Sequence, residues 1–343
     1  MAAVITTVLI VVGSIAGAGG VGLGVHGGVK LRRASKRIKA AKEISDKNTR
    51  KLEDQNVSTC TIMDALGRNE MEALKDFEQF SSLIEKINER PNYDSINPNY
   101  DIPKFDPAEI KRVSVGASAL VSGLGGAALG TAGAFAASSA TSAAVIAVGS
   151  ASTGALLNTL HGAALTNATL AAIGGGSLAA GGGGMALGTI VLGAASLGVG
   201  LLIGGVIFTL TGSSIQGKAA TVEKQVQENE KKINEVCRYL KSLLTTADKY
   251  SQTLSKMRHL YSTYLKKMKE IIDRNAIDGR VSWLKLNDDE RILIDNTILI
   301  VGIIYNMCKV SFVKETAEDG LNKINLKEIK KAEAEANKAM VEL

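Results

Sequence analysis

Aromatic residues and cysteine are scarce in this chain, and each shortage argues against a class of protein. Phe, Trp and Tyr make up 4% of the 343 residues, whereas a conventional large enzyme core would use more of them. The cysteines are odd in number and widely spaced, which argues against a disulfide framework and favours a reducing compartment; they are Cys60, Cys237 and Cys308. A disordered chain is excluded too, because 45% of the residues are apolar and the net charge is only +6.

Charged residues are missing altogether from two long windows. Residues 1–29 contain no Asp, Glu, Lys or Arg, and neither do residues 113–217, a run of 105 residues interrupted only by His161. Of the 36 glycines, 8 lie in the first window and 24 in the second, which leaves 4 for the rest of the chain. The remainder is charged and helix-prone, so the sequence predicts an all-α, membrane-associated protein. Long amphipathic helices would flank a glycine- and alanine-rich hydrophobic region of helical hairpins.

The first window predicts an N-terminal hydrophobic anchor over residues 1–29. About 20 apolar residues suffice to cross a bilayer, and the segment is a poor secretory signal because its basic residues follow the apolar stretch. By the positive-inside rule these basic residues stay in the cytoplasm. We expect them to meet anionic lipid headgroups; the first five are Lys30, Arg32, Arg33, Lys36 and Arg37. Two alternatives stay open: a glycine-rich buried helix with a solvated basic face, and nucleic-acid binding by the basic cluster.

An amphipathic helix is predicted for residues 30–90 and a proline-rich linker for residues 91–107. Residues 67–69 offer a break point within the helix. All four prolines of the chain fall in the linker. The run Asp106-Pro107-Ala108-Glu109 joins an N-cap residue, proline at the first helical position and an acidic third position, so a helix is expected to start there. The second half of the amphipathic helix carries an apolar stripe at helical spacing, formed by Leu74, Phe77, Phe80, Ile84 and Ile87.

Residues 108–217 form the predicted membrane region. Residues 190–210 are its most hydrophobic part and a span by themselves, and small residues would let helix backbones approach closely in lipid. The length fits two to four embedded helices, and we favour an even number. The glycines expected at packing contacts are Gly174, Gly175, Gly176, Gly181, Gly182, Gly183, Gly184 and Gly188. Three polar residues lie in this region, and we expect an interhelical hydrogen bond or an exposed loop for them, with a position facing a partner helix or a water-filled path as the alternative: Asn158, His161 and Asn167.

Residues 218–275 are predicted to form one long coiled-coil helix. Apolar residues alternate at four- and three-residue steps over more than six heptads, with only Glu230, Ser251 and Arg258 interrupting. Members of this register include Ile233, Leu240, Leu244, Leu254, Tyr261 and Leu265. The C-terminal region, residues 276–343, is expected to be helical. Its central helix is capped near Asn287, and residues 296–308 are too short for a span, so we expect that helix to be packed or interfacial.

No motif in the sequence points to catalysis. The run from Gly212 to Ala219 approaches a phosphate-binding loop, but Ala219 stands where the hydroxyl for magnesium is needed. The histidines His26, His161 and His259 have no Cys or carboxylate neighbours at ligand spacing. We therefore expect no catalytic residue, no cofactor and no metal, and neither a nucleic acid nor a small-molecule substrate as partner.

Two stretches of the second window resemble a bacterial family of largely uncharacterised membrane proteins. They are Thr-Gly-Ala-Leu-Leu-Asn-Thr-Leu-His-Gly-Ala-Ala-Leu-Thr-Asn-Ala-Thr-Leu at 153–170 and Gly-Gly-Gly-Ser-Leu-Ala-Ala-Gly-Gly-Gly-Gly-Met-Ala-Leu-Gly at 174–188. The run Ala-Leu-Gly-Arg-Asn-Glu-Met-Glu-Ala-Leu at 65–74 is similar to that family's helix before the linker. The resemblance reaches to about residue 270. It implies an apolar N-terminus, an amphipathic helix, a glycine-rich centre and a C-terminal coiled coil.

The plan of charged, hydrophobic and charged segments is also similar, more loosely, to apolipoprotein L proteins. That similarity implies a hydrophobic hairpin that enters membranes and alters ion permeability. The resulting hypothesis is a non-enzymatic, oligomeric membrane-inserting protein with a pore-forming or defence-effector role. It would reside in a bacterial inner membrane, with its flanking helices in the cytoplasm. A membrane-anchored coiled-coil scaffold, and a soluble bundle that hides its hairpin until triggered, are the alternatives.

Overall fold

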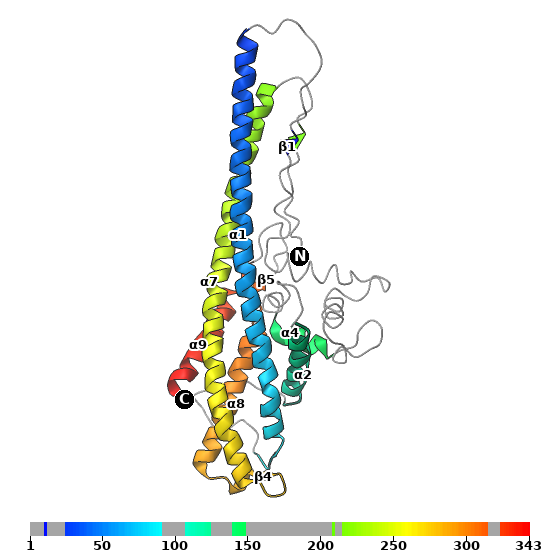
Figure 1. The fold of residues 1–343 in the computed structure, drawn as a ribbon. Helices are drawn as coiled ribbons and strands as arrows, with labels where there is room; N and C mark the ends of the chain where they lie inside the picture. The colour runs from blue at the N-terminus through cyan, green and yellow to red at the C-terminus, as the bar shows by residue number, and fades with distance from the viewer. Residues whose placement is uncertain are drawn as a thin grey trace. The chain divides into compact units, whose positions relative to one another are not determined.

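The computed structural model describes residues 10–11, 25–90, 107–124, 139–148, 208–209, 215–314 and 323–343. Within these ranges the chain forms six α-helices and a few two-residue strands (Figure 1). The all-α class predicted from the sequence is therefore confirmed for this part of the chain.

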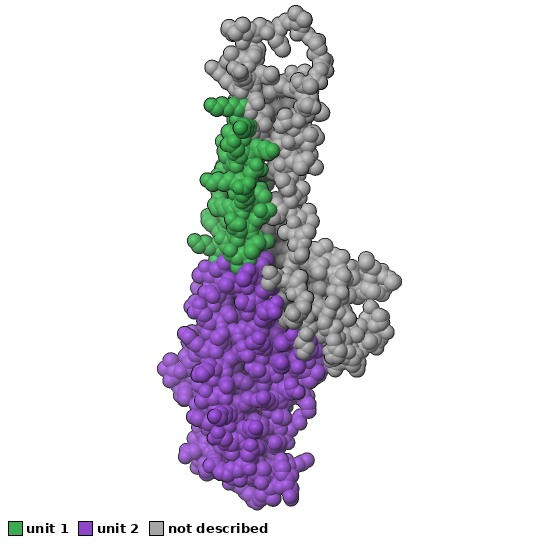
Figure 2. All heavy atoms as spheres, in the orientation of Figure 1, with its two compact units in different colours: residues 1–59, 199–243 green, residues 60–198, 244–343 purple. Residues whose placement is uncertain are grey.

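The chain divides into two compact units (Figure 2). Unit 1 comprises Met1–Thr59 and Val199–Leu243, and unit 2 comprises Cys60–Gly198 and Leu244–Leu343. Two long helices, α1 (Val25–Ile84) and α7 (Ile215–Asn275), supply residues to both units. The helix predicted for residues 218–275 is thus present as one continuous element.

Unit 1 pairs the first part of α1 with the first part of α7. Lys51 donates a 2.7 Å hydrogen bond to Asn234, and Thr59 Oγ1 donates at 3.2 Å to the carbonyl of Leu240. The apolar side chains buried in the pair include Ala41, Leu52, Val226, Val236, Leu240 and Leu243. Strand β1 (Ile10–Val11) runs parallel to β3 (Phe208–Thr209). These four residues are extended, although they lie in two segments for which the sequence predicts membrane helices.

Unit 2 surrounds the remainder of α1 and α7 with α2 (Pro107–Leu124), α4 (Ala140–Ala147), α8 (Asp288–Lys309) and α9 (Leu326–Glu342). Its core holds most of the aromatic side chains that the structure describes. Phe77 meets Tyr261 edge-on at 5.9 Å between ring centroids, and Tyr250 meets Phe312 at 5.1 Å. Such edge-to-face pairs contribute stability beyond the burial of their area.

Helix α1 runs without interruption through residues 67–69, so the break expected there is wrong. A glycine inside a helix costs only about 1 kcal/mol, and local packing offsets that cost. Gly67 is buried, and the Asn69 amide donates to the Ser251 carbonyl at 3.1 Å and to Ser255 Oγ at 2.9 Å. Tertiary contacts with α7 therefore override the local preference.

The predicted register of α7 agrees in part with the observed burial. Leu240, Leu254, Tyr261 and Leu265 are buried, whereas Ile233 and Leu244 are half-buried. Two further residues that the register omits, Tyr250 and Met257, are fully buried in unit 2. Their burial widens the apolar face, because α7 there meets more than one partner helix.

Short turns and caps position α8. Asp278 and Gly279, with φ of 51° and 78°, form a left-handed turn after α7, closed by the bridge between Ile277 and Arg280. Asn287 then caps α8 in a reciprocal capping box with Glu290, as the sequence leads one to expect. Two short pairings complete unit 2: β2 (Ile87–Asn88) runs parallel to β4 (Val281–Ser282), and β5 (Val313–Lys314) runs antiparallel to β6 (Lys323–Ile324).

Several sequence predictions lie outside the described residues. They concern most of the N-terminal anchor, the linker up to residue 106, and residues 125–138, 149–207 and 210–214 of the membrane region. These ranges include the glycines Gly174, Gly175, Gly176, Gly181, Gly182, Gly183, Gly184 and Gly188 and the polar residues Asn158, His161 and Asn167. The helix start predicted at Pro107 is confirmed, because α2 begins at that residue.

Candidate functional site

Helix α2 carries the beginning of the charge-free window into the core of unit 2. Pro107 is its first residue and Glu109 lies in its first turn, where an acidic side chain complements the helix dipole. One face of the helix is buried at spacings of three and four residues. This face consists of Ile110, Val113, Ser114, Ala117 and Leu120. The first residues of the charge-free window are therefore buried within the protein.

Helix α4 lies beside α2 and approaches it closely (Figure 1). Gly116 is the point of closest approach, because a Cβ atom placed there would lie 1.8 Å from the carbonyl oxygen of Ala144. No side chain other than hydrogen fits that space. Ala140, Ala143 and Ala144 are themselves buried. The contact is thus built from small residues, as the sequence predicts for its membrane helices.

The last turn of α8 holds both of these helices through polar contacts. The Tyr305 hydroxyl donates to the Glu109 carboxylate of α2. Lys309 lies 3.9 Å from the same carboxylate and 4.3 Å from the centre of the Tyr305 ring. Ser139, directly before α4, donates a 3.4 Å hydrogen bond to the Cys308 carbonyl. Burial and the bond to Glu109 raise the pKa of Tyr305, so its hydroxyl keeps the proton that it donates.

The same turn also contacts the two long helices. The Tyr250 hydroxyl of α7 donates at 2.9 Å to the Met307 carbonyl, and the Cys308 thiol lies 3.8 Å from the Glu70 carbonyl of α1. Carbonyls in the last turn of a helix lack intrahelical partners, which makes them available for such bonds. We call Tyr305, Met307, Cys308 and Lys309 the docking seat, since α1, α2, α4 and α7 all meet there.

Glu70 lies beside the docking seat and is the least expected residue of unit 2. It is fully buried, and neither of its carboxylate oxygens has a hydrogen-bond partner. Burial raises its pKa well above the ordinary value for glutamate. Sequence reasoning missed this residue, although a signal exists. Glu70 follows Leu66 by four residues and precedes Leu74 by four, so it occupies a core position of the apolar stripe.

Among the described helices, α8 alone has the length and composition to cross a membrane. Of its most apolar window, 67% is buried within the protein. A core helix packed inside a folded unit meets the same criterion. The burial agrees with the sequence prediction that this helix is packed and not a free span.

In unit 1 the predicted headgroup residues lie along α1. Lys30, Arg32 and Arg33 belong to that helix, and Lys36 and Arg37 are exposed on it. Arg37 pairs with Glu223 of α7, and this pairing raises the pKa of Arg37 and lowers that of Glu223. The basic cluster is therefore partly neutralised by a partner on the neighbouring helix.

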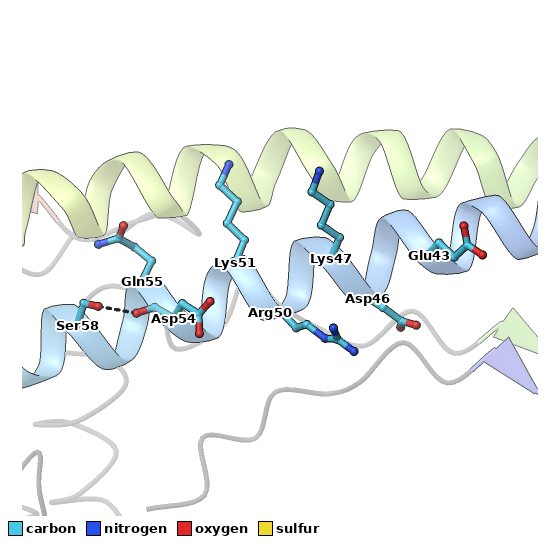
Figure 3. A pocket seen from close by; sticks show the side chains of 8 residues that line it. All are labelled: Glu43, Asp46, Lys47, Arg50, Lys51, Asp54, Gln55 and Ser58. Atoms are coloured by element: carbon cyan, nitrogen blue, oxygen red, sulfur yellow. Dashed lines mark hydrogen bonds between the residues drawn. The ribbon is translucent and has the colours of Figure 1, made fainter.

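A groove of about 700 Å³ lies further along α1 (Figure 3). Lys47 and Lys51 rise toward α7, while Asp46 and Arg50 point to the other side. Three cations and three anions line it together with two neutral side chains, so the groove has no excess of either charge: Glu43, Asp46, Lys47, Arg50, Lys51, Asp54, Gln55 and Ser58. It therefore has no charge preference for an anionic or a cationic ligand.

Nothing in the described ranges brings three His, Cys, Asp or Glu side chains together in a way that would hold a metal ion. No family model, curated protein or solved structure matches this chain. The interpretation of its function therefore depends on the two units themselves.

Proposed function

We propose that this chain is a non-enzymatic, α-helical membrane-inserting protein that perturbs bilayer permeability. The inserting element is the charge-free segment, residues 113–217. Its partners would be the lipid bilayer and further copies of the chain, joined through a coiled coil of α7. The protein would act at a bacterial inner membrane, with the flanking helices in the cytoplasm.

The observation that carries the proposal is the packing of α2 and α4 against the charged helices of unit 2. These helices contain described residues from the beginning of a segment with no Asp, Glu, Lys or Arg over 105 positions. Their mutual contact depends on Gly116 and alanines, which pack equally well in protein or in lipid. A segment of this kind is compatible with both surroundings, whereas an ordinary aqueous core would use larger apolar side chains.

One feature of unit 1 supports a membrane location. The basic side chains at the start of α1 follow an apolar N-terminal window, an order that favours contact with anionic headgroups on the cytoplasmic side. Self-association is a separate part of the proposal: the apolar register of α7 is largely buried within this chain, so pairing between copies would require it to exchange partners, and such pairing would bring several charge-free segments together.

Alkaline carbonate extraction of membranes from expressing cells, followed by dye release from vesicles containing phosphatidylglycerol, tests the proposal. The full chain is compared with a variant in which a flexible Gly/Ser linker replaces residues 149–207. This variant retains every described helix and strand. We expect the full chain to stay in the membrane pellet and to release dye, and the linker variant to release none.

The remaining outcomes are also informative. Retention of the linker variant in the pellet without dye release would assign anchoring to residues outside 149–207 and permeability to residues 149–207. Absence of dye release by the full chain, across pH values and lipid compositions, would contradict the proposal. Circular dichroism of both proteins checks that the helices are intact.

A membrane-anchored scaffold is the second candidate, and the groove on α1 favours it. Along one helix the groove offers a block of cations between acids, a surface suited to another helix of complementary pattern; in chain order its charged residues are Glu43, Asp46, Lys47, Arg50, Lys51 and Asp54. Reversing the charge of the exposed Lys47 and Arg50 separates the two functions. Loss of partner binding with dye release unchanged would give the groove a scaffold role, and unchanged partner binding would count against it.

A further inference from the structure

Glu70 is an anomaly that the packing of unit 2 does not explain. Its carboxyl group lies in the apolar stripe of α1, with no exposed surface and no hydrogen bond to either oxygen. Burying an ionised carboxylate without a partner is strongly unfavourable, and such a group becomes protonated instead. An apolar side chain at this position would avoid the cost. A buried acid of this kind calls for a functional explanation.

The groups around Glu70 leave it without a cationic partner. Tyr250 of α7 and Cys308 of α8 lie close enough to interact electrostatically with Glu70. Burial, followed by the charge of Glu70, raises the pKa of both groups. The positive charge of Arg258 in α7 lowers the pKa of Cys308. The Arg258 guanidinium is itself paired with Asp76 at 2.9 Å and with Glu72 at 3.0 Å. From α9, the charges of Glu333 and Glu335 raise the pKa of Tyr250, and Glu333 pairs with Lys249.

The docked helices also provide no cation for Glu70. Helix α4 has no titratable residue in its sequence. The charged residues of α2 make other interactions. Glu109 contacts Tyr305 and Lys309, and Lys111 pairs with Glu85 at 2.7 Å. The charge of Arg112 lowers the pKa of Tyr305.

We propose that Glu70 is a proton-operated switch of the docking seat. With its carboxyl protonated, the last turn of α8 stays packed on α1 and holds α2 and α4. When the carboxyl loses its proton, the resulting charge needs hydration. Water gains access to Glu70 when the last turn of α8 separates from α1. The separation breaks the contact between the Cys308 thiol and the Glu70 backbone carbonyl. It also displaces Tyr305, which is bonded to Glu109, and Cys308, which is bonded to Ser139. Release of α2 and α4 follows.

The direction of the pH dependence follows from the burial of the carboxyl. Because the packed state raises the pKa of Glu70 above its ordinary value, the packed state binds this proton more tightly than the open state does. The contribution of Glu70 to packing is therefore complete at pH values below about 4.3, the ordinary pKa of glutamate. It is lost progressively as the pH rises toward the raised pKa. Alkalinisation, and not acidification, opens the docking seat at this residue.

Hydrogen exchange of the full-length protein across pH tests the switch directly. The measured quantity is the opening constant of amides in α2 and α4, obtained after correction for the intrinsic pH dependence of exchange. Glu70→Gln removes the charge and nearly keeps the shape, and Glu78→Gln changes an exposed glutamate of the same helix as a control. Ion pairs such as Lys309–Glu109 are present in both proteins, so the ratio of wild type to Glu70→Gln isolates Glu70.

We expect this ratio to rise with pH by up to tenfold per pH unit, the limit for one proton. The Glu78→Gln protein should behave as the wild type does. A ratio that is independent of pH, or one that falls as the pH rises, would overturn the proposal. Should Glu70→Gln fold poorly, Glu70→Met provides an apolar side chain of similar length, and the same two outcomes decide.

The step from release to insertion rests on the proposed function, and vesicle dye release keeps the two ideas separate. A pH-dependent ratio without dye release at any pH would retain the switch and reject insertion. Dye release with a pH-independent ratio would retain insertion and reject the switch. If both hold, Glu70→Gln should reduce dye release at pH 8 and leave it unchanged at pH 4.

Discussion

The two units use the same two helices and reach different kinds of packing. In unit 1 the described helical segments contain a single aromatic residue, Tyr239, and polar bonds at the helix rims accompany a narrow apolar seam. In unit 2 four more helices surround the pair, and large side chains such as Phe77 and Tyr250 are fully buried. The comparison shows that one helical register supports a simple pair or a closed core, depending on which other segments pack against it.

The largest expected effect is a difference between two leucines of α7. Leu240 in unit 1 and Leu254 in unit 2 are both fully buried. Leu254→Ala should cost about 3–5 kcal/mol, because a closed core collapses poorly around the cavity, and Leu240→Ala should cost about 2–3 kcal/mol, near the low end for such changes. Urea unfolding followed by fluorescence of Trp283, the only tryptophan and a residue of unit 2, measures the first.

Hydrogen exchange of residues 215–243, in the same proteins, measures the cost of Leu240→Ala in unit 1. The circular dichroism of each variant at low urea confirms that it folds. Equal costs at Leu240 and Leu254 would contradict the comparison, since they would mean that the helix pair resists collapse as strongly as the core of unit 2.

A smaller effect is expected where α2 meets α4. Gly116→Val places a branched side chain where a Cβ alone would lie 1.8 Å from the Ala144 carbonyl oxygen. Overpacking of this kind costs about 1–3 kcal/mol, and here it should be relieved by separating α2 from α4. Limited proteolysis should then cut the chain near residues 107–148 more quickly. Ser142→Val adds similar bulk at an exposed position of α4 and should leave the cleavage rate unchanged.

The sequence was sufficient to predict elements whose signals are local. The start of α2 at Pro107, the continuity of α7 and the cap of α8 at Asn287 all follow from neighbouring residues. Heptad spacing along α7 predicts burial against one partner. It does not predict the burial of Tyr250 and Met257, because the additional partners of unit 2 come from distant parts of the chain.

The candidate site lies beyond this local reasoning. The docking seat at the end of α8 meets residues of α1, α2 and α7 and Ser139 directly before α4, and no short motif predicts that meeting. Glu70 was detectable in principle from its spacing to Leu66 and Leu74, but an acid at a core position conflicts with the apolar pattern and is easily assigned to the neighbouring exposed face. Gly67 shows the same limit in reverse, because its propensity favours a break that packing against α7 prevents.

Substitutions of two arginines allow the polar contacts of the two units to be compared. Arg258 in unit 2 is half-buried and donates to Asn69 at 2.9 Å, to Glu72 at 3.0 Å and to Asp76 at 2.9 Å. Arg258→Met should cost about 2 kcal/mol, because it leaves these acceptors without their charged donor. Arg37→Met in unit 1 should leave the urea midpoint unchanged, since exposed ion pairs contribute little.

Salt sharpens the distinction between these arginines. Raising the ionic strength screens exposed charges more than partly buried ones. The destabilisation by Arg258→Met should therefore persist in 1 M salt, as measured by the shift of the urea midpoint relative to wild type under the same condition. A loss of that shift in salt would mean that the Arg258 network behaves like the exposed pair of unit 1.

The smallest expected effect concerns the turn that follows α7 in unit 2. Gly279 has φ of 78°, with no heavy atom within 4 Å of an added Cβ, so a substitution meets backbone strain and no steric clash. Gly279→Ala should cost about 1 kcal/mol, the penalty for a side chain in the left-handed region. Gly279→Asn should cost less, because asparagine tolerates that region better than alanine does. The fluorescence of the nearby Trp283 reports both changes as small shifts in the urea midpoint. Exchange of residues 215–243 in unit 1 should be unaffected, and slower folding without a change in midpoint would mean that the turn acts on kinetics alone.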